Sequence, residues 1–129
     1  MKNALLVGLG GCVGCVARYL TSVLVSRVVE APSLPYATLL VNVTGCLLIG
    51  LLSEAAGDSA VTTAGLRPEL RLLLVVGFLG GLTTFSTFGF ETFTLGREGQ
   101  PRVALLNIAA HLLLGLGAIG AGMWLAKLT

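Results

Sequence analysis

The stretch GFLGGLTTFSTFGFE, residues 77–91, places a glycine pair and four hydroxyl side chains inside a long apolar run. At mid-membrane depth, Gly80–Gly81 can unwind a helix, and unwound backbone is tolerated there only where protein buries it or it lines a polar cavity. The carbonyls freed by such a break can coordinate a cation, as they do in the broken helices of transporters. The stretch therefore predicts a third helix that is broken mid-membrane and carries a functional site.

Aromatic and hydroxyl side chains crowd together just after the glycine pair. Phe85 and Phe88 are three residues apart and share a helix face, and Ser86 and Thr87 lie beside them. The edge of a phenyl ring is electropositive, so ring edges and hydroxyl donors together can stabilise a desolvated anion. In a generic membrane helix, the alternative is rings that face lipid and hydroxyls that bond back onto their own helix. The crowding favours the anion site.

The composition indicates an integral membrane protein. The chain has 129 residues, of which 55% are hydrophobic and 11% are charged, against about 25% charged in soluble domains. A net charge of only +2 argues against nucleic acid as a partner. The three cysteines lie in apolar runs, where we expect small buried residues. Cys12 and Cys15 form a C-x-x-C, but no second pair or nearby histidine completes a metal site.

Uncharged runs mark four membrane spans. About 20 helical residues cross the hydrocarbon core. We expect helices at about 4–28, 36–56, 70–95 and 103–127, within one transmembrane channel domain that covers residues 1–129. Small residues at helical spacing, such as Gly10 and Gly14, allow helices to approach closely in lipid. Four thin helices enclose little space, so we expect an oligomer.

The basic residues give no orientation signal. With four spans, both termini and the middle loop share one side of the membrane. That side carries Lys2, Arg67, Arg71 and Lys127, and the other carries Arg27, Arg97 and Arg102, with Arg18 nearby in the first span. Orientation normally follows a Lys/Arg excess on the cytoplasmic side. Without that excess, a single orientation and insertion in both orientations remain equally open from this count.

Each span carries a segment that resembles one family. These segments are GGCVGCVARY (10–19), LLVNVTGCLLIG (39–50), GFLGGLTTFSTFGFE (77–91) and ALLNIAAHLLLG (104–115). Over its whole length the chain resembles the CrcB/Fluc fluoride channels, and the third segment is the most specific. The resemblance implies an all-α subunit of four transmembrane helices in the inner (plasma) membrane. It also implies an antiparallel dual-topology homodimer in lipid, with two fluoride pores and a central structural Na⁺.

The resemblance assigns roles to individual residues. Backbone carbonyls of Gly80 and Thr83 from both subunits would hold the sodium ion. The pore residues would be Asn42, Phe85, Ser86, Thr87 and Phe88, and the vestibule residues Arg18 and Glu91. The family places serine and threonine one turn apart on the fourth helix, where this chain has Gly115 and Ile119.

Several of these residues also have structural interpretations. Asn42 can make an interhelical hydrogen bond, typically worth about 1 kcal/mol. Arg18 is the one cation within a span, and it either serves the aqueous vestibule or extends to the interface. Glu91 can equally pair with an arginine. His111 lies one turn after Asn107 and is either a packed neutral histidine or a pH sensor.

Three function classes are open to such a chain. The first is a passive fluoride-selective channel that exports cytoplasmic fluoride and lowers its toxicity. The alternative is a small four-helix proton-coupled multidrug exporter, which needs a carboxylate deep in the membrane, and none of the six acidic residues lies mid-span. The third is a non-transporting scaffold, which would not need the hydroxyl and aromatic cluster. No nucleotide motif or nucleophile–base pairing indicates an enzyme.

Overall fold

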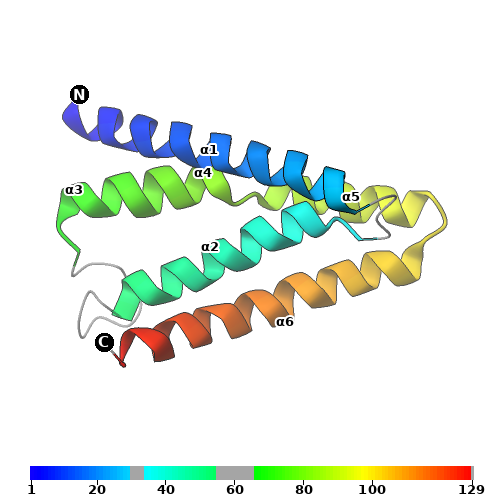
Figure 1. The fold of residues 1–129 in the computed structure, drawn as a ribbon. Helices are drawn as coiled ribbons and strands as arrows, with labels where there is room; N and C mark the ends of the chain where they lie inside the picture. Colours follow the sequence, from blue (N-terminus) through cyan, green and yellow to red (C-terminus); the bar gives the residue numbers. More distant parts are fainter. Residues whose placement is uncertain (30–33, 55–65, 129) are drawn as a thin grey trace.

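The computed structural model describes residues 1–29, 34–54 and 66–128, and these parts of the chain are largely helical (Figure 1). Four of the elements build the third span in sequence, and α5 is joined to the last helix by a short turn. The elements are α1 (Lys2–Val28), α2 (Tyr36–Glu54), α3 (Pro68–Leu70), the π-helix η2 (Arg71–Leu79), α4 (Gly80–Leu82), α5 (Phe85–Arg97) and α6 (Pro101–Ala126).

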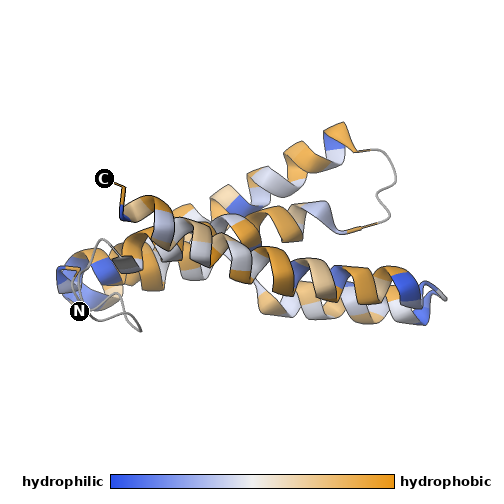
Figure 2. Ribbon diagram, turned by 90° about the horizontal axis from the view of Figure 1, so that it is seen from below, coloured by the Kyte–Doolittle hydropathy of each residue, from blue (hydrophilic) through white to orange (hydrophobic). Residues whose placement is uncertain are grey.

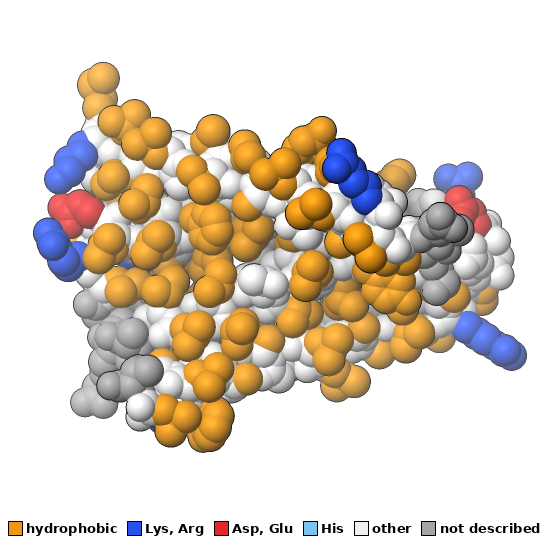
Figure 3. All heavy atoms as spheres, in the orientation of Figure 1, with side chains coloured by type: hydrophobic (Ala, Val, Ile, Leu, Met, Phe, Trp, Pro, Cys, Tyr) orange, Lys and Arg blue, Asp and Glu red, His pale blue; other side chains and the backbone are white. Residues whose placement is uncertain are grey.

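The helices form four spans long and apolar enough to cross a membrane. These spans are Lys2–Val28, Tyr36–Ser53, Pro68–Arg97 and Pro101–Ala126. Hydrophobic residues fill the length of the bundle, and hydrophilic residues gather at its ends (Figure 2). On the face seen in Figure 3, apolar side chains cover the middle and most charged ones lie toward the two ends. The chain is an all-α multi-pass membrane protein, as the composition predicted.

Glycines bring α1 into backbone contact with the third span. α1 packs mainly against η2 and α4, and Gly10 and Gly14 are its buried residues. A Cβ atom at Gly10 would collide with the carbonyl of Leu73, and one at Gly14 with the carbonyl of Phe78. The predicted close packing at this pair is therefore present.

The second helix pair, α2 and α6, uses glycine in the same way at only some positions. A Cβ at Gly122 would collide with the carbonyl of Leu47 on α2. A Cβ at Gly117 or Gly120 would meet no atom of another element within 4 Å, so both lie on an uncovered face of α6 in the single chain.

The expectation that the cysteines are buried was wrong for α1. Cys12 and Cys15 are exposed, and Cys46 on α2 is half-buried. Glycine rather than cysteine occupies the contact face of α1, because only glycine allows the backbone-to-backbone approach described above.

The third span is interrupted at Thr83 and Thr84, three residues after the expected position. Gly80 keeps helical angles (φ −64°, ψ −33°), whereas Thr83 (φ −87°, ψ 154°) and Thr84 (φ −152°, ψ 115°) are extended. Gly81 serves close packing instead, since a Cβ there would lie 2.5 Å from the carbonyl oxygen of Gly11. The expectation that the glycine pair itself unwinds was therefore wrong.

Candidate functional site

A single side chain from α2, that of Asn42, pairs with the backbone at the interruption. The backbone N–H of Thr84 donates to Oδ1 of Asn42 at 2.8 Å, and Nδ2 of Asn42 donates to the Thr84 carbonyl at 3.2 Å. The amide thereby satisfies both backbone groups of an extended residue that has left the helix. The interhelical hydrogen bond considered for Asn42 is present, and one N–H of its amide remains beyond this pair.

The same contacts release two helix carbonyls. In a continuous helix, Thr84 N–H would bond to Gly80 O and Thr87 N–H to Thr83 O. Instead, Thr84 N–H donates to Asn42, and Thr87 N–H donates to Oγ1 of Thr84 at 3.3 Å. Gly80 and Thr83 thus each lose the usual donor of a helical carbonyl. Carbonyl oxygens are ligands that hard cations prefer, so these two residues fit a sodium site.

Three hydroxyls cluster at the start of α5. Oγ1 of Thr84 lies 3.2 Å from Oγ of Ser86 and 3.1 Å from Oγ1 of Thr87, and it caps α5. Ser86 and Thr87 are exposed. The hydroxyl of Thr83 differs, because it donates to the carbonyl oxygen of Leu79 on its own helix at 2.9 Å. It therefore bonds back onto its own helix, which is the alternative considered for hydroxyls in a membrane span.

Three aromatic rings are in contact in sequence from the surface to α6: Phe85, Phe88 and His111. Phe85 is 82% exposed, and its ring centroid lies 5.6 Å from that of Phe88. The centroid of Phe88 lies 4.3 Å from that of His111, whose Nδ1 is 3.0 Å from the carbonyl oxygen of Asn107. The predicted pore rings therefore lie together, and the histidine is in contact with one of them.

The two predicted vestibule residues have different surroundings. Oε1 of Glu91 accepts a 2.8 Å hydrogen bond from the Thr38 hydroxyl on α2, and Oε2 is buried without a partner in the described parts of the chain. No ion pair joins Glu91 to an arginine within those same ranges. Arg18 is half-buried, with Nη2 3.9 Å from Sγ of Cys15.

Two cavities that include polar side chains in their lining meet at the interruption. One, of about 340 Å³, is lined by Arg18, Thr38, Thr84 and Thr87 among others. The other, of about 350 Å³, includes Asn42, Thr83, Thr84, Phe85, Phe88 and His111 in its lining. Thr84 lines both cavities, so the two cavities adjoin at this residue.

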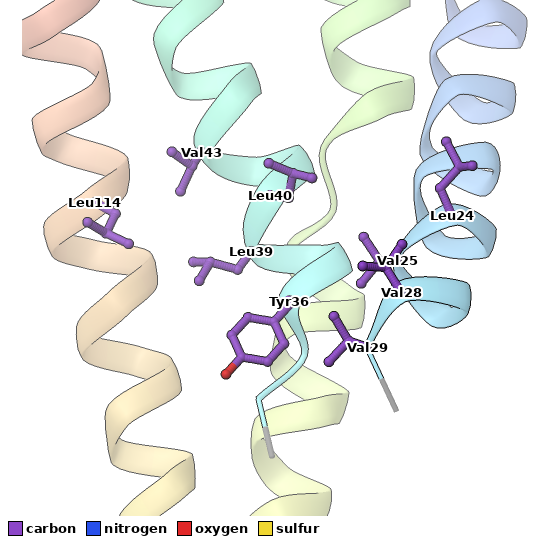
Figure 4. Close-up of a pocket in the computed structure, with 9 residues that line it drawn as sticks. All are labelled: Leu24, Val25, Val28, Val29, Tyr36, Leu39, Leu40, Val43 and Leu114. Atoms are coloured by element: carbon purple, nitrogen blue, oxygen red, sulfur yellow. The ribbon is translucent and has the colours of Figure 1, made fainter. Parts of the chain in front are cut away.

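A larger cavity lies away from these polar groups. It measures about 550 Å³ and is lined by the end of α1, the start of α2 and Leu114 of α6 (Figure 4). Its lining is almost wholly aliphatic, so it offers nothing that would bind an ion. Among residues 1–29, 34–54 and 66–128, no group of three His, Cys, Asp or Glu side chains could hold a metal.

Comparison with known proteins assigns the chain to a family. Residues 5–123 match the family described as CrcB-like protein, Camphor Resistance (CrcB). The chain belongs to the CrcB-like family. This confirms the resemblance seen in the four sequence segments.

Relatives that match the CrcB-like chain over nearly its full length carry the name fluoride-specific ion channel FluC, among them proteins from three organisms. The Chlorobaculum tepidum protein is 48% identical, with 99% of this chain and 97% of the relative covered. The Chlorobium luteolum protein is 45% identical, with coverages of 97% and 92%. The Geobacter sulfurreducens protein is also 45% identical, with 98% of each covered.

The CrcB-like chain departs from the expected pattern on α6, and there the residues contact α2. A Cβ at Gly115 would lie 3.5 Å from Sγ of Cys46, and a Cβ at Gly50 would collide with the carbonyl of Ile119. At these positions α6 therefore packs closely against α2.

Sequence reasoning missed Thr84, Thr38 and Thr92 in this CrcB-like chain. Thr84 had a local signal, since threonine is a favoured residue immediately before a helix. Thr38 binds Glu91, and Thr92 accepts a 2.8 Å hydrogen bond from Asn107, which is fully buried. These two contacts join residues far apart in the sequence, and no spacing predicts them.

Proposed function

We propose that this chain forms a passive fluoride-selective channel in the plasma membrane. The observation that carries the proposal is the interruption at Thr83–Thr84, where hydroxyls, an amide and aromatic rings surround two cavities. Membership of the CrcB-like family supports it, as does the name of the relatives. Fluoride enters a bacterial cell as neutral HF and dissociates in the less acidic cytoplasm, and the channel would let it leave and so lower its toxicity.

The chemistry of the interruption suits a small dehydrated anion. Ser86 and Thr87 offer exposed hydroxyls, Phe85 offers its ring edge, and the free N–H of Asn42 supplies a further donor. Arg18 lines the cavity next to these hydroxyls and would attract an anion toward them. Fluoride is smaller than chloride and accepts shorter hydrogen bonds, so closely spaced donors replace its water more fully.

The proposal includes an antiparallel dual-topology homodimer with Na⁺ at its centre. The freed carbonyls of Gly80 and Thr83 support the ion site, and the uncovered face of α6 around Gly117 and Gly120 supports a second subunit. When bound, the ion would supply a fixed positive charge that draws the two interruptions together mid-membrane. A density map of the dimer in sodium that has no ion between the two interruptions would contradict this part.

Efflux from liposomes that contain only this protein tests the function. We expect fluoride to leave rapidly under its own gradient, and chloride to be retained in matched vesicles. Equal efflux of the two anions would overturn the proposal. Proton-driven movement of a lipophilic drug cation, without fluoride efflux, would favour the multidrug exporter instead.

Phenylalanine variants test the ring edges within the same assay. Phe85→Ile and Phe88→Ile should each lower fluoride flux about fivefold, the equivalent of about 1 kcal/mol of aromatic interaction, with the dimer intact by size-exclusion chromatography. Phe90→Ile is the control, since Phe90 is 72% exposed on the same helix and lines neither cavity at the interruption. Wild-type flux in Phe85→Ile and Phe88→Ile would show that the rings only pack.

A further inference from the structure

His111 is held in one tautomer by its own helix. Nδ1 lies 3.0 Å from the carbonyl oxygen of Asn107, one turn earlier on α6. A carbonyl oxygen only accepts, so Nδ1 must carry the hydrogen in this contact. In the neutral ring, Nε2 is then left with a lone pair and no hydrogen.

That lone pair belongs to a ring that lines the cavity at the interruption. Nε2 is buried and has no hydrogen-bond partner among the described residues. His111 lines the cavity that also contains Asn42, Thr84 and Phe88, and its ring lies against that of Phe88, with centroids 4.3 Å apart and planes tilted by 42°. A lone pair in this position disfavours an anion, whereas an N–H in the same position would bind one.

Few ionisable groups face the imidazole. α6 packs against α2 and α5. From α5, Glu91 is close enough for the two charges to interact, and from α2, Cys46 lines the same cavity. Among the described residues, no lysine or arginine lines that cavity. A protonated ring would therefore be stabilised by Glu91 and by the face of Phe88.

We propose that His111 is a proton-responsive binding residue of the fluoride path: its neutral ring disfavours the anion beside Phe88, and its protonated ring donates Nε2–H to fluoride. The inference rests on the proposed channel function. The proton comes from water in the cavity and returns to it, so no bond other than N–H forms or breaks. Acidic conditions, which drive HF into cells, would then open the path further.

The test is fluoride current in planar bilayers at equal pH on both sides, since neutral HF carries no current. Because acid supplies the proton that Nε2 lacks, we expect current to be about threefold or more higher at about pH 5.5 than at about pH 7.5. His111→Gln has no titrating ring and should lose this rise. Because His111 is the sole histidine of the chain, no other imidazole can replace its effect. Glu91→Gln should keep the rise, whatever its absolute current.

The outcomes separate the two proposals. No fluoride current at any pH would refute the channel itself. A current that is independent of pH, or a rise that survives in His111→Gln, would overturn the role of His111 and leave the channel standing.

Nitrogen-15 spectra of the single histidine give a readout that does not depend on current. We expect the Nδ1–H tautomer at high pH, and a larger protonated fraction in fluoride than in chloride at the same acidic pH, because binding and protonation favour each other reciprocally. An Nε2–H tautomer at high pH, or a protonated fraction that fluoride does not change, would also overturn the proposal.

Discussion

At the scale of single residues, the Asn42 side chain makes the backbone hydrogen bonds that a continuous helix would otherwise provide to Thr84. Its amide accepts from the N–H of Thr84 and donates to the carbonyl of Thr84. Unpaired backbone groups are costly in lipid, so an extended residue within a span needs such a partner. The contact therefore stabilises the interruption and redirects the N–H that Gly80 would otherwise bind.

We expect Asn42→Ala to destabilise the protein by about 2–6 kcal/mol, because it leaves two backbone groups unpaired at about 1–3 kcal/mol each. Fluoride flux should fall at the same time. Thermal unfolding in detergent and liposome efflux measure the two effects. Thr44→Ala is the matched control, since Thr44 lies on the same helix and is exposed. If both variants unfold alike, the Asn42 amide does not hold the interruption.

At the scale of helices, the bundle consists of two close pairs, which are joined by a small apolar cluster of α1, α2 and the third span and by polar contacts. α1 packs against η2 and α4, and α2 packs against α6. Thr38 of α2 then binds Glu91 of α5, which ties the second pair to the third span beyond its interruption. Apolar packing thus sets the pairs, and single hydrogen bonds set how α5 sits against α2.

The glycine contact between α1 and the third span can be tested by adding one methyl group. Gly14→Ala should lower stability by about 1–3 kcal/mol, since the new Cβ meets the carbonyl of Phe78 and forces the backbones apart. Gly8→Ala is the control on the same helix, where nothing lies within 4 Å. Unfolding temperatures in detergent measure the difference. Equal temperatures would show that α1 has room to move away without loss.

How far the sequence predicts these elements depends on whether the signal is local. Uncharged runs predicted four spans, because a charge within lipid is costly and marks a helix end. The position of the interruption was missed, since Gly81 has two uses, unwinding and close packing, and only the neighbouring Gly11 decides between them. The π-helix Arg71–Leu79 has no composition signal, and the contact of Asn42 with Thr84 spans 42 positions. The pore and sodium assignments for individual residues stay predictions.

At the scale of the whole molecule, the single chain exposes a large apolar surface along its spans. Both termini lie at one end of the bundle, as four spans require (Figure 1). Basic residues occur at both ends, and Lys2 forms an ion pair with Glu69 at 3.3 Å at the terminal end. Large apolar side chains remain exposed along the spans, where lipid or a second copy would cover them.

We predict that single chains insert in both orientations and pair antiparallel, because the Lys/Arg counts on the two sides are nearly equal. The measurement labels one cysteine, introduced between α2 and α3 in a chain whose own cysteines are replaced by alanine, with a membrane-impermeant reagent on intact cells. About half of the chains should react. Two or three lysines added at the N-terminus should force one orientation and abolish flux. All-or-none labelling in an active protein would contradict dual topology.

The interruption at Thr83–Thr84 also has an electrical consequence. A helix carries partial negative charge at its carboxyl end and partial positive charge at its amino end, each equivalent to about half an elementary charge. α4 ends at Leu82 and α5 begins at Phe85, so the two opposite poles face each other across two residues. A cation at the freed carbonyls and an anion at the start of α5 are then each stabilised by the nearer pole. One break in one helix can in this way serve ions of both signs without a formal charge of its own.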